Sequence, residues 1–299
     1  MKNRKLLAAV TALGILSFGL AGCVNNTANT PEKPKTETGG VDAAAAKLLP
    51  EDIAKGGVLI IGSDLSNPPS TYKDPNGNPA GWEIELADLL SARLGLKSDI
   101  RNAPFDNILP SVMGGQYQIG FSGYFDTKER EQKVDMVDYF NSGVRWAAAK
   151  GNGGNIDPDN ACGLKVAAQA NTFESEADLP EKSDACVKAG KKPIEIMKFS
   201  TQQDFSTAVA LGRADAMTAD APVVEWLVQQ SEGKLELAGD MYSPFVLGIV
   251  VSKDNTKLRD AVVAGMQATL DDGSYMEVLK KWGIESGAID KIGINGAPN

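Results

Sequence analysis

Histidine is absent from the 299 residues, and cysteine occurs only three times. Without histidine the chain has no Ser-His-Asp or Cys-His catalytic group and no histidine-ligated metal or haem. Three cysteines are too few for a four-cysteine zinc or iron–sulfur site. The formal net charge of -9 argues against nucleic acid as a partner, because phosphate binding needs clustered lysine and arginine. The composition therefore indicates no metal, no cofactor and no nucleic acid.

Long apolar runs are missing except at the N-terminus. There Lys2, Arg4 and Lys5 precede residues 6–21, which carry no charge. This run is shorter than the roughly 20 residues of a helix that crosses a bilayer. A basic start, a short apolar run and small residues after it are typical of a secretory signal. We therefore interpret residues 1–22 as a signal peptide.

The end of this segment reads Leu20-Ala21-Gly22-Cys23, which resembles a bacterial lipobox. The resemblance implies cleavage before Cys23 and diacylation of its sulfur, as in a palmitate-bearing lipoprotein. An uncleaved anchor or a chance cysteine is the alternative. No later segment is long and apolar enough to span a membrane, so the mature chain is expected outside the cytoplasm, attached to the cell membrane by its lipid.

Residues 23–50 are poor in large apolar side chains and rich in asparagine, threonine, proline, lysine and alanine. Such a segment buries too little surface to offset the entropy of ordering it. We expect a flexible linker between the lipid and the folded part of the chain.

Cys162 and Cys186 are the two cysteines that remain once Cys23 is assigned to the lipid. In an exported protein an even remainder favours a disulfide. Two buried free thiols are the alternative.

Strand and helix patterns alternate along residues 58–282. Residues 58–62 are a short apolar run that ends at glycine, which predicts a buried strand. Residues 83–94 carry isoleucine and leucine at helical spacing before Gly95, which predicts a helix. A second strand–helix series begins near residue 164. Strands are also predicted at 118–121, 144–149, 215–217 and 245–252, and helices at 107–113, 205–211, 222–230, 258–270 and 275–282.

This alternation predicts an α/β fold with mainly parallel sheets and two lobes. In such sheets a ligand binds at the carboxyl ends of the strands. No GxGxxG or GxxxxGK[ST] pattern occurs, so dinucleotide and P-loop sites have no support.

From about Val58 to Trp282 the chain resembles the family 3 extracellular solute-binding proteins, the amino-acid receptors of ABC importers. The order and spacing of several short motifs carry the resemblance. They are Gly62-Ser63-Asp64, Gly81-Trp82-Glu83-Ile84-Glu85-Leu86, Thr127-Lys128-Glu129-Arg130, Asp138-Tyr139-Phe140-Asn141-Ser142-Gly143, Gln169-Ala170-Asn171-Thr172, Gly212-Arg213-Ala214-Asp215-Ala216 and Asp220.

The resemblance implies a type II periplasmic-binding-protein-like fold with two hinge crossings. Lobe 1 is expected at residues 51–140 plus 245–288, lobe 2 at 141–244 and a C-terminal tail at 289–299. The implied partners are a free amino acid and an ABC permease in the membrane, with the receptor itself a monomer. A sensory subunit of the same fold and a dehydratase-like enzyme derived from it are the alternatives.

An amino acid presents a carboxylate and an ammonium, and each needs an opposite charge. Arginine offers a planar two-pronged donor for the carboxylate, and an ionised aspartate suits the ammonium. Arg130 matches the family's carboxylate-binding arginine and Asp220 its ammonium-binding aspartate. Without the resemblance, Arg130 reads as a solvated residue at a helix start, and Asp220 as a helix N-cap.

The resemblance also assigns further residues to the ligand. Thr172 opens a helix whose amides suit a carboxylate, and Trp82 is expected to stack on the ligand side chain. The other positions are Asp64 and Gln169 near the side-chain end, Gly123 as a backbone contact, and Phe125 and Asn171.

The chain departs from the family where the ligand side chain is expected to lie. Phe125 replaces a hydroxyl residue, and the Gly-Thr-Thr loop reads Asn171-Thr172-Phe173. We hypothesise that Phe125 and Phe173 make the pocket more apolar than usual. Both rings turned away from the cleft would exclude this.

Overall fold

The computed structural model describes residues 40–298. Its main sheet has the strand order β5-β1-β6-β11-β7-β10-β8-β9, with β12 on β7, and β2, β3 and β4 form a small second sheet. The strands are β1 Val58–Ser63, β2 Ser66–Asn67, β3 Thr71–Lys73, β4 Pro79–Ala80, β5 Lys97–Asn102, β6 Ile119–Gly120, β7 Val134–Ala149, β8 Lys165–Gln169, β9 Glu195–Phe199, β10 Ala216–Asp220, β11 Leu235–Ser252 and β12 Gly293–Ile294.

Helices cover the faces of the main sheet. They are α1 Ala43–Ala46, α2 Glu51–Gly56, α3 Trp82–Arg93, α4 Phe105–Met113, α5 Lys128–Lys133, α6 Leu179–Lys188, α7 Gln202–Ala210, α8 Ala221–Gln230, α9 Thr256–Asp271 and α10 Ser274–Trp282. Short 3-10 turns occupy Gly153–Asn155, Pro158–Asn160 and Glu285–Gly287, and Glu174–Asp178 is π-helical. Among the described residues, no helix has the length and apolarity to cross a membrane.

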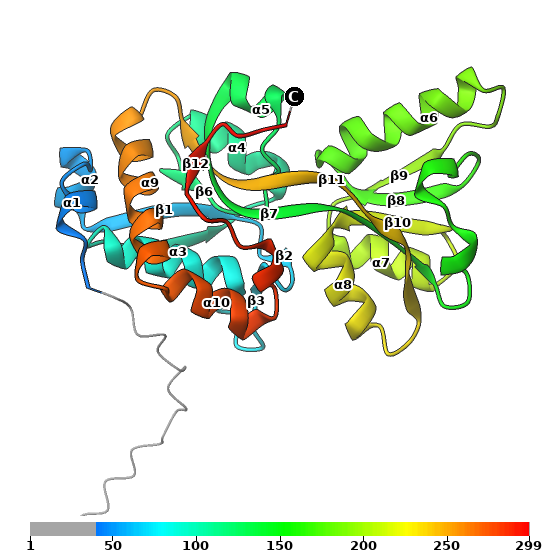
Figure 1. Ribbon diagram of the computed structural model, residues 1–299, viewed down its shortest axis with the longest axis horizontal. Coiled ribbons are helices and arrows are strands. Elements are labelled where there is room, and N and C mark those ends of the chain that lie inside the picture. The colour runs from blue at the N-terminus through cyan, green and yellow to red at the C-terminus, as the bar shows by residue number, and fades with distance from the viewer. Residues whose placement is uncertain (1–39, 299) are drawn as a thin grey trace, which may run out of the picture. The chain divides into compact units, whose positions relative to one another are not determined.

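Two groups of parallel strands lie at the ends of the main sheet. β5, β1 and β6 are parallel in the first lobe, and β10, β8 and β9 are parallel in the second. Figure 1 shows β7 and β11 running between the two lobes. The predicted two-lobed α/β fold is confirmed.

The connection between the lobes differs from the prediction. Residues 144–149 and 245–252 were expected to be short strands, but they are the ends of the long antiparallel pair β7 and β11. Residues 138–143 are too polar to suggest a buried strand from local pattern. Their backbone bonds to β11, so distant pairing extends the strand.

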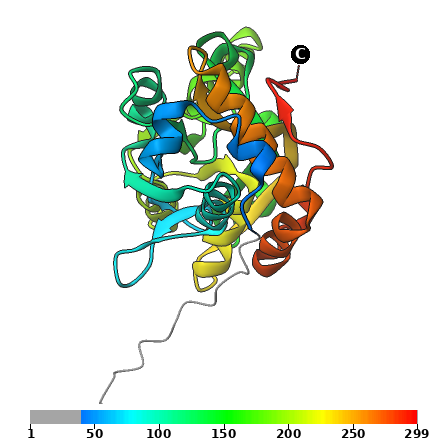
Figure 2. The same cartoon turned by 90° about the vertical axis from the view of Figure 1, so that its left-hand side faces the viewer.

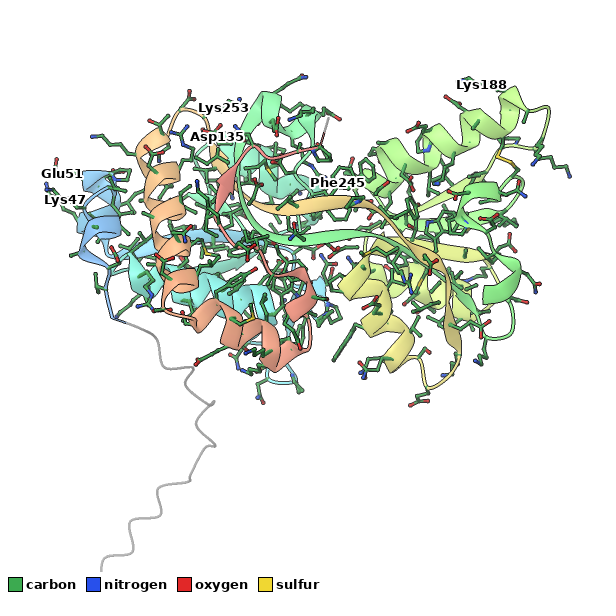
Figure 3. All side chains as sticks on the ribbon, in the orientation of Figure 1. Lys47, Glu51, Asp135, Lys188, Phe245 and Lys253 are labelled. Carbon is green, nitrogen blue, oxygen red and sulfur yellow. A yellow bond between two sulfur atoms is a disulfide. The ribbon has the colours of Figure 1, made fainter. Side chains whose placement is uncertain are left out.

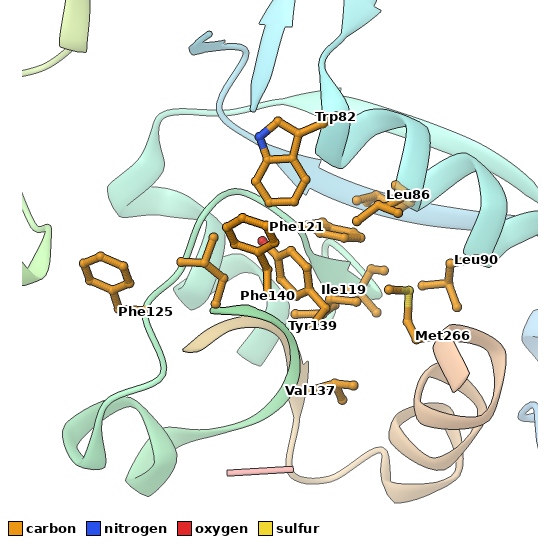
Figure 4. Close-up of a cluster of buried hydrophobic side chains, with 14 of the residues drawn as sticks. Trp82, Leu86, Leu90, Ile119, Phe121, Phe125, Val137, Tyr139, Phe140 and Met266 are labelled. Atoms are coloured by element: carbon orange, nitrogen blue, oxygen red, sulfur yellow. The ribbon is translucent and has the colours of Figure 1, made fainter. Parts of the chain in front are cut away.

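Close helix packing forms the core of the first lobe. The helix α3 carries the predicted leucine spacing, and Leu86, Leu89 and Leu90 are fully buried. At Gly265 of α9 a Cβ would lie 2.7 Å from Leu90 Cδ1, so glycine allows the two helices to approach. Figure 4 shows Leu90 beside Met266 of α9 in this cluster.

Part of the expected linker is folded, which corrects the prediction for residues 40–50. Asp42 caps α1 through Ala45 N, at 2.8 Å, and Ala45 is fully buried. Arg93 Nη1 donates to Gly40 O at 2.8 Å. Figure 2 shows α1 beside α9. Ala45, on the helix that packs against α9, and Leu49 are the buried apolar residues of residues 40–50, so a segment with few large apolar residues is still anchored to the core. The predicted signal peptide, Cys23 and linker residues 23–39 lie outside the described residues.

Two further features tie the chain ends and loops together. Cys162 and Cys186 form a disulfide, as predicted. In the expected C-terminal tail, β12 pairs with β7, where Gly293 lies opposite Asp138. The tail is thus part of the first lobe's sheet over those residues.

Candidate functional site

One cavity is lined by residues of both lobes. Gln169 ends β8 and Asp220 ends β10, so the second lobe contributes the carboxyl ends of its parallel strands. This is where the sequence predicted a ligand. The predicted site residues that the structure brings together here are Arg130, Asp220, Thr172, Gly123, Phe125 and Gln169.

Arg130 is half-buried on α5, a helix that Thr127 caps. Its Nη1 donates to Phe125 O at 2.8 Å and its Nη2 to Asn171 O at 3.4 Å. The guanidinium carbon lies 5.0 Å from the centre of the Tyr124 ring. Within residues 40–298, Arg130 forms no ion pair. Burial lowers its pKa, so a ligand carboxylate would meet a poorly hydrated cation.

Asp220 is the last residue of β10 and directly precedes α8. The Ser142 hydroxyl donates to Asp220 Oδ1. Burial raises the pKa of Asp220 well above its usual value, and no lysine or arginine of the described chain forms an ion pair with it. An ammonium group placed beside Asp220 would favour the ionised carboxylate and gain a strong charged hydrogen bond.

Thr172 and Asn171 form the turn that leads into the π-helical residues. Asn171 has a φ of 63°, in the left-handed region that asparagine tolerates better than most residues. The Thr172 hydroxyl donates to Gln169 O at 2.9 Å, and Ser175 N donates to Thr172 Oγ1 at 3.3 Å. Thr172 therefore shapes the turn with its side chain, and Asn171 contributes its carbonyl to Arg130.

Asp64 is buried behind the cavity wall and reaches the wall through Gln169. Gln169 Nε2 donates to Asp64 Oδ2 at 3.0 Å and to Ser200 O at 3.1 Å. The Ser66 hydroxyl donates to Asp64 Oδ1 at 2.7 Å. Burial raises the pKa of Asp64, and these hydrogen bonds oppose that rise. No cationic residue of the described chain is ion-paired with Asp64.

Trp82 is not brought to the cavity, contrary to the prediction that it stacks on the ligand. It is fully buried, its Nε1 donates to Ser70 Oγ at 3.0 Å, and its ring lies 4.8 Å from that of Phe140. Figure 4 shows Trp82 over Phe140, with Phe125 apart from them. A buried tryptophan needs a partner for its N–H, and Ser70 supplies it.

Phe105, which the sequence analysis did not select, lines the cavity instead. Its ring stacks on Tyr124 at 4.4 Å. The available signal was its place after Pro104, just beyond the end of a strand, where binding loops occur. Gly123 lies nearby with a φ of 62°, which glycine adopts readily.

Phe125 and Phe173 both line the cavity, so the apolar-pocket hypothesis is retained. Their ring centres are 6.1 Å apart, and each ring also contacts Phe245, at 5.1 and 4.5 Å. Figure 3 labels Phe245 on β11, between the two lobes. The three rings therefore connect both lobes with the crossing strand.

Glu174 was also missed by the sequence analysis. It lines the cavity, is 3% exposed, and burial raises its pKa to about 7. Its position two residues after a predicted helix-opening threonine was the only signal.

Within the part of the chain that the structure describes, no group of three or more His, Cys, Asp or Glu side chains is arranged to hold a metal ion.

A cavity between two α/β lobes that are joined by two strands, lined by an arginine and an aspartate that form no ion pair within residues 40–298, defines a two-lobed solute-binding protein. The chain belongs to the bacterial extracellular solute-binding proteins, family 3, whose sequence profile matches residues 59–285.

Individual relatives agree with this family. The chain is 37% identical to the arginine-binding protein ArgT of Corynebacterium glutamicum over 298 residues. The match covers 99% of this chain and 97% of that protein. Among solved structures, an ancestral arginine-binding protein bound to arginine matches with a TM-score of 0.69 and 28% identity, over 76% of this chain and 98% of its own. An ancestral amino-acid-binding protein, described as a precursor of cyclohexadienyl dehydratase, matches with a TM-score of 0.68 and 28% identity, over 79% and 99%.

Proposed function

We propose that this protein is an extracytoplasmic receptor that binds a cationic amino acid, with arginine the first candidate, and delivers it to an ABC importer. Arg130 takes the ligand carboxylate and Asp220 the ammonium, because both side chains line one cavity and neither has an ion-pair partner within residues 40–298. The similarity to arginine-binding proteins supports the choice of ligand.

The observation that carries the cationic preference is Asp64. Arg130 and Asp220 balance a zwitterion, and Asp64 adds a buried carboxylate that Gln169 links to the wall. A ligand with a positive side chain would balance this remaining charge, whereas a ligand with an acidic side chain would add to it. Phe105, stacked on Tyr124, offers an apolar surface for the aliphatic part of such a side chain.

We further propose that ligand capture closes the lobes about the β7–β11 crossing. The pairing register of β11 shifts between Ala238 and Tyr242 and between Tyr242 and Phe245, where the two strands pass between the lobes. The proposed hinge uses the boundaries predicted from the sequence, at residues 140/141 and 244/245. A ligand held by Arg130 of one lobe and Asp220 of the other favours the closed state.

Titration calorimetry with arginine, lysine, glutamine and glutamate tests the proposed ligand class. We expect arginine to bind most tightly and glutamate not to bind. Recovery of the bound amino acid unchanged checks that the protein performs no conversion. Tight binding of glutamate with no binding of arginine would refute the proposal.

The membrane attachment is a separate part of the proposal and rests on the lipobox at Leu20-Ala21-Gly22-Cys23. Mass spectrometry of the membrane-bound protein should show a mature N-terminus at Cys23 that carries acyl chains. Cys23→Ser should release the protein from the membrane fraction without affecting amino-acid binding, and a variant that stays attached would contradict the lipid anchor.

A further inference from the structure

Glu174 stands apart from the other charged groups of the site because nothing in the zwitterion clamp requires it. It lines the ligand cavity and is 3% exposed. Its Oε1 has no hydrogen-bond partner within residues 40–298. A buried carboxyl oxygen without a donor is costly when it is ionised, so its environment needs a specific explanation.

The charged groups around Glu174 come from four elements. Arg130 of α5 is the cation that acts on it, and Glu174 acts on Arg130 in turn. The acidic groups are Asp178 in the same π-helical segment and Asp220 at the end of β10, and the Tyr242 hydroxyl of β11, which donates to Asp178, also interacts with Glu174. Glu174 and Arg130 line the same cavity without forming an ion pair, so a ligand carboxylate bound to Arg130 would share that cavity with Glu174.

Two carboxylates near one guanidinium conflict when the ligand arrives. The ligand carboxylate and an ionised Glu174 carry like charges in a buried space, where their repulsion is weakly screened. Protonation of Glu174 removes this repulsion and converts one oxygen from an acceptor into a donor. Burial raises the pKa of Glu174 to about 7, so the proton is available near neutral pH.

We propose that an ionised Glu174 repels the ligand carboxylate that binds Arg130 in the same cavity, and that ligand binding therefore takes up one proton from solvent onto the Glu174 side chain. This inference rests on the proposed amino-acid function and adds a regulation to the same site. Ligand capture is then stronger in mildly acidic medium and weaker in alkaline medium. It also completes the charge balance of the complex: Arg130 and a cationic amino acid against Asp220 and Asp64, with Glu174 neutral.

The test compares arginine dissociation constants of the wild type and Glu174→Gln from pH 6 to pH 8. Glutamine imitates the protonated glutamate at every pH. The ratio of wild-type to variant dissociation constants should be near one at pH 6 and rise about tenfold by pH 8, as expected for one proton linked to binding. The titration of arginine itself cancels in this ratio.

Glu181→Gln is the matched control, since Glu181 is an exposed glutamate at the start of α6, outside the cavity. The ratio of wild-type to Glu181→Gln dissociation constants should not change with pH. Glu174→Ala is a second variant that removes the same charge, and it should show the same pH-dependent rise if Glu174→Gln folds poorly.

A wild-type to Glu174→Gln ratio that is constant with pH would overturn the role of Glu174 and leave the proposed function intact. A ratio that falls as pH rises would also overturn it, because ionised Glu174 would then assist binding. Failure of the wild type to bind any amino acid at pH 6 would overturn both proposals.

Discussion

Gln169 and Asp64 lie 105 positions apart in sequence and are joined by a hydrogen bond of 3.0 Å from Nε2 to Oδ2. The bond connects the end of β8 in the second lobe to the loop after β1 in the first. It therefore joins the two lobes at the cavity wall, and behind that wall it holds a carboxylate that has no cationic partner among residues 40–298.

Asp64→Asn should reduce the preference for arginine over glutamine. The substitution keeps the shape of the side chain but removes the charge that balances a cationic ligand. We expect arginine affinity to fall by about tenfold, as for the loss of one partly screened charge contact, with glutamine affinity nearly unchanged. Calorimetry with both ligands measures this. An equal loss for the two ligands would show that Asp64 acts only through the structure of the lobe interface.

Arg130→Ala and Asp220→Ala should each abolish detectable amino-acid binding. Each variant leaves the opposite ligand charge buried without a partner, which costs about 2–5 kcal/mol or more at such sites. Arg101→Ala, at an arginine that is exposed and paired with Asp99 on β5, is the control and should bind normally. Melting curves check that the variants fold. Unchanged affinity in both cavity variants would refute the clamp.

Asp126→Asn should make stability less dependent on pH. Asp126 is fully buried, neither carboxyl oxygen has a hydrogen-bond partner within residues 40–298, and burial together with nearby Asp138 raises its pKa from 3.8 to about 8. The folded state therefore holds a proton that the unfolded chain releases, so stability falls as pH rises between these two values.

The measurement is the melting temperature of the wild type and Asp126→Asn at pH 5 and pH 8. The melting temperature of the variant relative to that of the wild type should rise from pH 5 to pH 8, by roughly 2–4 °C for each 1 kcal/mol of relative stabilisation. Asp135→Asn is a comparison at a neighbouring aspartate that is paired with Arg259. A melting-temperature difference that is the same at both pH values would contradict a shifted titration of Asp126.

Replacing Cys162 and Cys186 together with serine should destabilise the second lobe. The disulfide closes a loop with a sequence separation of 24 residues, for which the chain-entropy model predicts about 3 kcal/mol. The melting temperature should fall by roughly 6–12 °C. A reductant should lower the melting temperature of the wild type but not that of the variant. Arginine affinity should persist below the melting transition. An equal melting temperature for variant and wild type would show that the crosslink adds no stability.

Local sequence patterns predicted the elements in which buried residues recur at a regular spacing. The leucines of α3 and the apolar run of β1 lie on one face or in one short stretch, so a few neighbouring residues identify them. The joined strands β7 and β11 were only half predicted, because their polar central residues are ordered by pairing with each other. Residues 43–46 were predicted to be linker because alanine contributes little apolar area, although Ala45 is buried where α1 packs on α9.

The candidate site was predicted to a similar extent. Arg130 and Asp220 were identified because their motifs occur in a recognisable order, and both line the cavity. Trp82 was predicted to contact the ligand, but it lies in the core. Its N–H donates to the Ser70 hydroxyl, and its ring packs against that of Phe140. Glu174 was missed, because its burial and its nearness to Arg130 depend on how the second lobe meets the first.

The amino-acid sequence by itself determined the absence of histidine chemistry, the alternation of strands and helices, and the family to which the chain belongs. These depend on residue identity and on spacing within short segments. Only the tertiary structure decided which side chains face the cavity, which carboxyl groups lie buried without a partner, and where two strands cross between the lobes. Those properties arise from contacts between residues far apart in sequence, such as Gln169 with Asp64, 105 positions apart, and Ser142 with Asp220, 78 positions apart. Burial and charge effects act over distances in space, not along the chain.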